Sequence, residues 1–408
     1  MFLDAIKTMW RQPGYVGILA ANFALGMAYS FVVPFMSLWG TKHIGMTPLV
    51  FGTFMALTSV SAMVLSVWLA KWSDSHVTRR TMLLAGGAAG AIGYIGYAYV
   101  SNVFALTVIG AIFLGIASVN FSQLFAHMRE ELARPENASV NGPLLMSVLR
   151  VSFSLAWTFG PAVGAWVMVQ FGYRGIFLGA AILFVVFLAG VAAFVPHRPH
   201  PPMASQPKRE PLLQVLTRRD LLTYFIGFTL VFAALNISMM NLPLMVTQQL
   251  GGTERHVGII YSIAPFFEVP LMIWFSHLAA RGYQMAIMRL GVVMSVLYFG
   301  VLIFVQAPWH IYPAQVLNAV SIAITTNVVI TFFQDLLPGR TGLATSIYSN
   351  SFNGGTLLGY FLFGLLLNAF GYRGVFVICT VFSLITLGLM FVRWKNPPSG
   401  AEQLEPAH

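Results

Sequence analysis

The chain has 408 residues, of which 58% are hydrophobic and only 8% are charged. A soluble domain has about 25% charged residues, so this composition excludes a soluble globular protein. The net charge of +10 does not indicate a nucleic-acid partner, because nearly all basic residues lie outside the apolar segments, in loops and tails. The single cysteine, Cys379, excludes an intrachain disulfide.

Apolar stretches of helix length run through the chain, and about 20 such residues suffice for one membrane span. After an interfacial segment at 1–14, the first six helices are predicted at 15–40, 49–71, 81–100, 103–127, 142–170 and 175–195. A proline-rich cytoplasmic linker at 197–219 separates them from six more, at 220–247, 256–280, 287–306, 310–335, 342–369 and 375–394. A polar tail occupies 396–408. We therefore predict an all-α membrane protein with twelve transmembrane helices, in an N-terminal bundle at 15–196 and a C-terminal bundle at 220–395.

The distribution of Lys and Arg predicts the orientation of these helices. With the N-terminus inside, 17 of these residues lie on the cytoplasmic side and four, Lys42, Arg174, Arg255 and Arg373, on the other. Cytoplasmic loops carry the excess of basic residues in membrane proteins. Both termini are therefore expected in the cytoplasm.

The second half of the chain repeats the first. The sequence FGYRGIF at 171–177 returns as FGYRGVF at 370–376, and an offset of 207 aligns Asn120 with Asn327. Two similar bundles of six helices with the same orientation are typical of the major facilitator fold, in which the substrate site lies between the halves near the membrane midplane. The repeat therefore predicts two pseudo-symmetric six-helix bundles.

The loop after the second helix resembles the signature of this superfamily. It reads AKWSDSHVTRR at 70–80, with Asp74 and the pair Arg79 and Arg80 at matching places. Alanine and valine replace the two glycines of the signature, and the basic pair is shifted by one residue. An aspartate can cap a helix end while arginines hold it. We expect Asp74, Arg79 and Arg80 to form a latch that stabilises one conformation.

Three longer segments resemble the bacterial sugar efflux transporter (SET) family. They are NFSQLFAHMRE at 120–130, LRVSFSLAWTFGP at 149–161 and FQDLLPGRTGLATSIYSN at 333–350. The resemblance implies a proton-driven exporter of lactose-like or glucoside-like sugars from the bacterial cytoplasm. The segment FNGG at 352–355, in the span predicted at 342–369, stands where the family has a more basic, serine-rich segment. The identity of the sugar therefore stays open.

Glu268 is the one acidic residue placed deep inside a predicted span, and Pro265 and Pro270 flank it. Ionisable residues at membrane depth face a bundle interior or a cavity and mark ion pathways. We predict that Glu268 binds and releases the coupling proton, with Arg150, the one basic residue within a span, tuning its environment. The alternatives are a neutral packing role for Glu268 and a surface-directed side chain for Arg150.

A sugar site needs amide donors and acceptors together with an aromatic platform. The predicted spans carry amides and aromatic rings of this kind, although each amide alone could equally join two helices. The candidate sugar-binding residues are Asn22, Asn120, Gln123, Trp157, Asn236, Tyr261, Asn318, Asn327, Asn350 and Asn353.

These features predict a sugar exporter of the bacterial inner membrane that works by proton antiport and alternating access. It is expected to act as a monomer in the lipid bilayer, without a metal or cofactor. A multidrug exporter of the same superfamily is the first alternative, because 34 phenylalanines would suit an apolar cavity. A solute-sensing receptor that transports nothing is the second. An enzyme is not expected, since neither HExxH nor GxSxG occurs.

Overall fold

The computed structural model describes residues 13–75, 77–132, 134, 142–197 and 218–392. Most of the predicted interfacial segment 1–14, the linker 197–219 and the tail 396–408 lie outside these residues. Two compact units divide the chain. The first comprises Met1–Met46, Phe54–Ala204 and Val257–Ser262, and the second comprises Thr47–Thr53, Ser205–His256 and Ile263–His408. The predicted limits of the two bundles stay predictions.

The N-terminal half is a set of packed helices. In chain order they are α2 (Pro13–Val32), η1 (Val33–Phe35), α3 (Met36–Leu38), η2 (Trp39–His43), α4 (Pro48–Ser75), α5 (Arg79–Tyr99), α6 (Val103–Ile109), η3 (Gly110–Leu114), α7 (Gly115–Ala117), α8 (Val119–Leu132) and α9 (Gly142–Phe194). Helix α2 packs along α9, and α5 packs against both α9 and α8. Small residues allow this close packing, since a Cβ atom at Gly90 of α5 would overlap the ring of Phe184 in α9.

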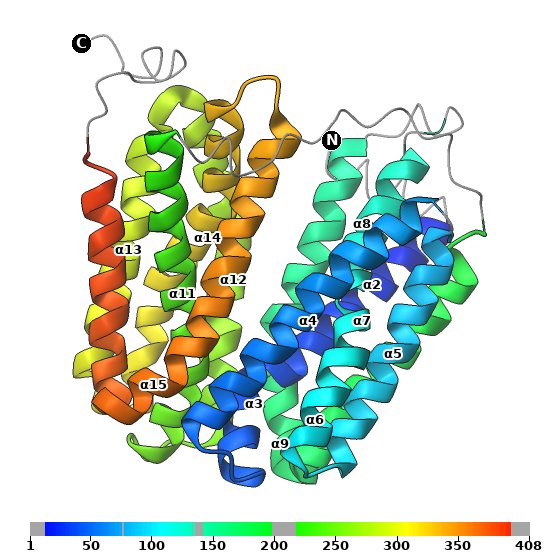
Figure 1. The fold of residues 1–408 in the computed structure, drawn as a ribbon, viewed down its shortest axis with the longest axis horizontal. Coiled ribbons are helices and arrows are strands. Elements are labelled where there is room, and N and C mark those ends of the chain that lie inside the picture. The colour runs from blue at the N-terminus through cyan, green and yellow to red at the C-terminus, as the bar shows by residue number, and fades with distance from the viewer. Residues whose placement is uncertain (1–12, 76, 133, 135–141, 198–217, 393–408) are drawn as a thin grey trace. The chain divides into compact units, whose positions relative to one another are not determined.

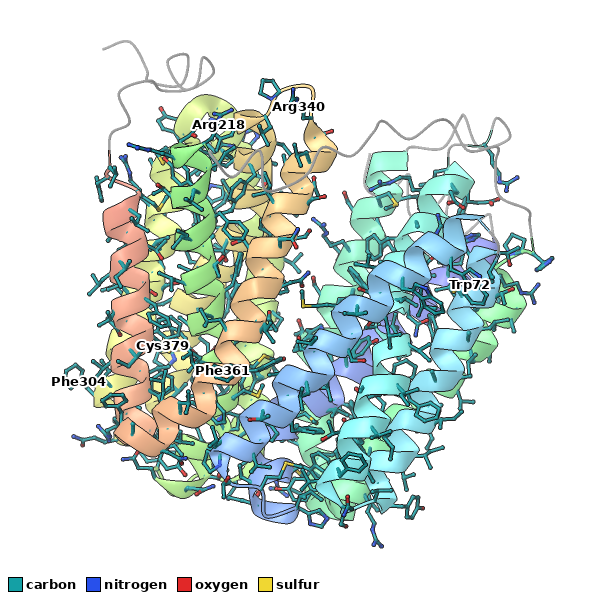
Figure 2. The ribbon with its side chains drawn as sticks, viewed as in Figure 1. Trp72, Arg218, Phe304, Arg340, Phe361 and Cys379 are labelled. Carbon is teal, nitrogen blue, oxygen red and sulfur yellow. The ribbon has the colours of Figure 1, made fainter. Side chains whose placement is uncertain are left out.

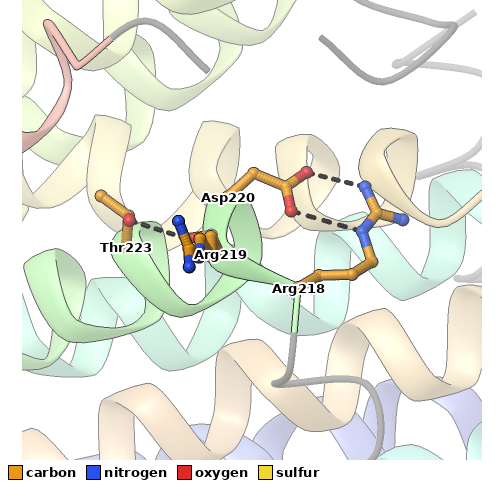
Figure 3. Close-up of polar contacts among 4 residues, drawn as sticks. All are labelled: Arg218, Arg219, Asp220 and Thr223. Atoms are coloured by element: carbon orange, nitrogen blue, oxygen red, sulfur yellow. Dashed lines mark hydrogen bonds and ion pairs between the residues drawn. The ribbon is translucent and has the colours of Figure 1, made fainter. Parts of the chain in front are cut away.

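The C-terminal half has the same all-helical character (Figure 1). It contains α11 (Arg219–Gln248), α12 (Glu254–Leu278), η5 (Ala279–Tyr283), α13 (Gln284–Phe304), η6 (Pro308–His310), α14 (Ile311–Leu336) and α15 (Thr341–Leu389). Helix α11 lies along α15, and α13 packs against α14 and α15. At the start of α11, Arg218 Nη2 pairs with Asp220 Oδ2 at 2.7 Å and Thr223 donates to the Arg219 carbonyl (Figure 3). An acid in the first turn suits the positive end of the helix dipole.

Two helices are too long for one membrane crossing, and each is interrupted by a glycine. Helix α9 has 53 residues and is broken at Gly172 (φ 67°), and α15 has 49 residues and is broken at Gly371 (φ 65°). A straight helix of that length would span roughly 75–80 Å, far more than the ~30 Å hydrocarbon core. Within the described residues, nine helical stretches are long and apolar enough to cross a membrane. The number of twelve spans stays a prediction. A break within each long helix is compatible with one span on either side of it.

The repeated FGYRG sequence has a similar place in both units. In the second, Arg373 donates from Nη1 to the Ile303 carbonyl and from Nη2 to the Val305 carbonyl, each at 2.7 Å, at the end of α13. In the first, the Arg174 guanidinium lies 5.8 Å from the ring centroid of Tyr99, the last residue of α5. Each arginine therefore meets the carboxyl end of a helix, where a cation is stabilising.

Within the second unit, α11, α13 and the start of α15 run in the same direction, as the predicted orientation requires. Arg218, just before α11, and Arg340, just before α15, lie at one end of the unit, and Phe304, the last residue of α13, lies toward the other end (Figure 2). The core of this unit is apolar and rich in aromatic side chains, among them the buried Phe228, Phe232 and Phe333. The rings of Phe228 in α11 and Phe333 in α14 pack edge to face, with their centroids 6.2 Å apart.

Candidate functional site

Glu268 lies in α12 on the side away from the exposed residues of that helix. The exposed side chains include Phe266, Ile273 and Trp274, and at about 100° per residue they form one stripe. Glu268 falls on the opposite side and is half-buried. No described residue forms a hydrogen bond or an ion pair with it. A charged carboxylate in such a place costs about 2.5–3.5 kcal/mol on insertion scales, which favours a group that exchanges a proton.

The two prolines around Glu268 remove backbone donors from α12. Pro265 and Pro270 have no N–H, so the carbonyl four residues before each loses its helical partner. Just beyond the second proline, a side chain from α14 joins the helix. Asn327 Nδ2 donates to Ser276 Oγ at 2.6 Å and to the Met272 carbonyl at 3.4 Å. Helix α12 is therefore held from the side, next to the segment that the prolines weaken.

The other predicted amides of the second unit are also bonded within it. Asn236 Nδ2 donates to Thr356 Oγ1 at 3.2 Å and joins α11 to α15. Asn318 donates to Gln315, which in turn donates to the Tyr298 hydroxyl, joining α14 to α13. The remaining two differ: Asn350 is exposed and donates to the Ser346 carbonyl of its own helix. Asn353 is half-buried on α15.

In the first unit, two asparagines are completely buried with unused hydrogen-bonding atoms. Asn22 donates to the Leu149 carbonyl at 2.7 Å, but its Oδ1 atom has no partner among the described residues. Neither Nδ2 nor Oδ1 of Asn120 has a described partner. Its amide packs against Gly86 so closely that a Cβ atom there would overlap Oδ1. A buried polar group is normally hydrogen-bonded, so Asn120 is the strongest candidate in this unit for a polar ligand.

Gln123, a predicted sugar-binding residue, is bonded to the predicted latch. Arg79 Nη1 donates to Gln123 Oε1 at 2.9 Å, and Arg79 Nη2 lies 2.9 Å from Glu130 Oε1. Arg80 Nη2 donates to the Ala192 carbonyl of α9 at 2.7 Å. Sequence reasoning missed Glu130 as a partner, although an acid at the end of a helix facing a basic pair was a usable signal. The Asp74 side chain lies outside the described residues, so its part in a latch stays a prediction.

The remaining candidates are placed individually. Trp157 is half-buried on α9, and Tyr261 is half-buried on α12, two turns before Glu268. Arg150 is exposed on α9. Its interaction with Glu268 would join the two units and stays a prediction. Among the described residues, no group of three His, Cys, Asp or Glu side chains could hold a metal ion.

Comparison with known proteins places the chain in a family. The family model described as Major Facilitator Superfamily matches residues 18–342 and 224–407. A putative sugar efflux transporter of Deinococcus radiodurans is 32% identical, with 95% of this chain and 99% of that protein covered. Sugar efflux transporter A of Dickeya chrysanthemi is 30% identical, with 93% and 95% covered.

A solved structure supports the same fold. The crystal structure of the nucleoside transporter NupG (D323A mutant) matches with a TM-score of 0.78 at 14% identity, covering 93% of this chain and 100% of that one. At this identity the likeness concerns the fold alone. Together, the family match, the two relatives and the helical architecture show that the chain is a membrane transporter of the major facilitator superfamily, belongs to its sugar efflux transporter family, and is not an enzyme.

Proposed function

We propose that this protein exports a sugar from the bacterial cytoplasm by proton antiport, with Glu268 as the proton carrier. The observation that carries the proposal is the position of that carboxyl group. It is half-buried on the inward side of α12, between two prolines, with no partner among the described residues. A carboxyl group held in this way is neutral when protonated and can move through an apolar surrounding at little cost. When it loses the proton, it needs a polar partner.

The same residue can serve the sugar. A carboxylate accepts hydrogen bonds from hydroxyl groups, and a sugar offers hydroxyls in several directions. Proton loss from Glu268 would then strengthen the hydrogen-bond acceptor that a sugar uses, and proton uptake would weaken it. This exchange makes the two ligands alternate on one residue, which is the requirement for antiport. The relatives named for sugar efflux support the sugar as the solute.

Glu268→Gln tests the proposal in proteoliposomes. Glutamine has a similar shape but cannot exchange a proton, so sugar transport driven by a pH gradient should be lost. Sugar counterflow without a gradient should remain, because it needs no net proton movement. Glu254→Gln, an acid at the start of the same helix, is the matched control and should transport as wild type. Gradient-driven transport that survives in Glu268→Gln would refute the assignment.

A proton-coupled drug exporter is the second candidate, favoured by the 34 phenylalanines of the chain. Aromatic side chains suit lipophilic cations, whereas amides suit sugars. Competition experiments separate the two. Lactose-like sugars should inhibit transport, and lipophilic cations should not. Counterflow of any solute would exclude a receptor that transports nothing.

A further inference from the structure

Helix α12 has little backbone support around Glu268. Each of Pro265 and Pro270 removes one backbone hydrogen bond from the helix within three residues of the carboxyl group. Helices bend at such places unless a neighbour fixes them. The position of the Glu268 side chain therefore depends on contacts that α12 makes with other helices.

The described contacts include one polar connection just beyond this weak segment. Asn327 of α14 donates from Nδ2 to Ser276 Oγ at 2.6 Å and to the Met272 carbonyl at 3.4 Å. Ser276 Oγ donates in turn to the same Met272 carbonyl at 2.7 Å. The two N–H groups of the amide and the single hydroxyl proton are thus all used. Met272 and Ser276 follow Glu268 by one and two helical turns, on the same side of α12.

The side chains around the Asn327–Ser276 hydrogen bond are mostly apolar, so few other polar groups compete for it. Met272 and Phe275 pack on a core cluster that includes Ile324 and Val328 of α14. On the α15 side, the Tyr348 hydroxyl lies 3.4 Å from the carbonyls of Thr325 and Thr326, next to Asn327. An unpaired amide would cost free energy in these apolar surroundings. Near Asn327, α14 is therefore hydrogen-bonded to α12 on one side and to α15 on the other.

The repeat-related asparagine in the first unit has no such bond. Asn120 corresponds to Asn327 at the offset of 207. Its Nδ2 and Oδ1 atoms are buried without a described partner, and it packs on Gly86 of α5. The interhelical bond therefore occurs in the half that carries the acid, which argues against a general role in holding the repeat together.

We infer that Asn327 and Ser276 form a clamp that fixes the part of α12 bearing Glu268, and are positioning residues for proton exchange at that carboxyl group. The inference rests on the proposed function of Glu268 and assigns Asn327 a different role from direct sugar binding. Loss of either partner lets α12 shift at Pro270 and moves the carboxyl group relative to α14. The proton step changes, while the sugar-binding groups elsewhere keep their places.

A double-mutant cycle tests the clamp in proteoliposomes. Asn327→Ala and Ser276→Ala should each lower the rate of transport driven by a pH gradient between about 3-fold and about 20-fold, the range for hydrogen bonds between membrane helices. They should also shift the pH of half-maximal transport by about 0.4 to about 1.2 units. The double variant should lose less than the sum of the two single losses, because the Asn327–Ser276 bond can be lost only once. Ser276→Thr keeps the hydroxyl and should retain most of the rate.

Ser295→Ala is the matched control. It removes the 2.5 Å contact between Ser295 of α13 and Ser321 of α14, a bond between helices of the same unit that lies outside the proposed site. Its pH profile should match wild type even if its thermal stability falls. A merely structural clamp would lower stability in the same way but leave the pH profile unchanged, and that result would overturn the inference.

Three further outcomes can be distinguished. If Asn327→Ala raises the sugar concentration needed for half-maximal counterflow and Ser276→Ala does not, Asn327 binds sugar and the clamp is wrong. If Glu268→Gln keeps gradient-driven transport, the proposed function fails whatever the clamp variants do. If Glu268→Gln loses it and both clamp variants keep the wild-type pH profile, the clamp alone fails.

Discussion

Asn120 is a fully buried amide whose two polar atoms have no partner among the described residues. Leaving a buried polar group unpaired costs about 1–3 kcal/mol. Its neighbour Gly86 provides the space that the amide occupies. Such a residue is expected where stability is given up for function. A sugar that reaches this amide in another conformation would supply the missing hydrogen bonds.

Replacing Asn120 by leucine should therefore separate stability from transport. Leucine has the same branching and number of side-chain heavy atoms but no polar atoms, and it is bulkier. The free energy of unfolding should therefore stay within about 1 kcal/mol of wild type, because removal of the unpaired amide offsets the tighter packing. Sugar counterflow should be lost if the amide binds the solute. Thermal unfolding in detergent and counterflow in vesicles measure the two effects. A less stable variant with normal counterflow would contradict both expectations.

The sequence could place these asparagines in membrane spans but could not assign their partners. A polar side chain in an apolar stretch marks a helix, yet the rotation of that helix about its axis depends on all its neighbours. Asn327 and Asn120 are indistinguishable by position in the repeat, and only the structure separates a bonded amide from an unpaired one. Ser276, an unremarkable serine in an apolar run, was missed for the same reason.

At the scale of helices, the apolar runs predicted the elements closely. The span predicted at 256–280 is α12, Glu254–Leu278, and the one predicted at 310–335 is α14, Ile311–Leu336. The helix pairs on either side of Gly172 and Gly371 were expected to be separated by loops. In the structure, a single glycine with positive φ and non-helical backbone separates the two helices of each pair. A hydrophobic pattern finds spans but cannot find this interruption, because it depends on one backbone conformation.

Gly371→Ala should destabilise the second unit for this reason. Gly371 has φ 65° and ψ 179°, a region that is essentially restricted to glycine. No heavy atom lies within 4 Å of the added Cβ, so the cost of about 1–3 kcal/mol comes from the backbone alone. Thermal unfolding of the purified protein measures it.

Gly388→Ala is the matched control in the same helix. Its Cβ also meets nothing within 4 Å, but its backbone is helical. Alanine is favoured over glycine in a helix by up to about 1 kcal/mol, so the control should be as stable as wild type or slightly more so. Equal losses in the two variants would show that the positive φ of Gly371 is not the cause of the loss.

At the scale of the whole molecule, the distribution of basic residues and the positions of the helix ends indicate the same topology. Seventeen of 22 Lys and Arg residues fall on the predicted cytoplasmic side. Arg218 and Arg340, both assigned to that side, lie at the same end of the second unit (Figure 2). The arginines of the repeated FGYRG sequence, assigned to the other side, meet the ends of α5 and α13. Charge distribution and helix direction thus agree across the repeat.

Reporter fusions test this topology directly. Green fluorescent protein fused after Lys208 or at the C-terminus should fluoresce, because it folds in the cytoplasm, and alkaline phosphatase at the same places should be inactive. A phosphatase fusion after Gly251, in the loop between α11 and α12, should be active. The excess of Lys and Arg in the predicted cytoplasmic loops favours this orientation. An active phosphatase at residue 208 would reverse the orientation, and with it the direction of export and of proton movement at Glu268.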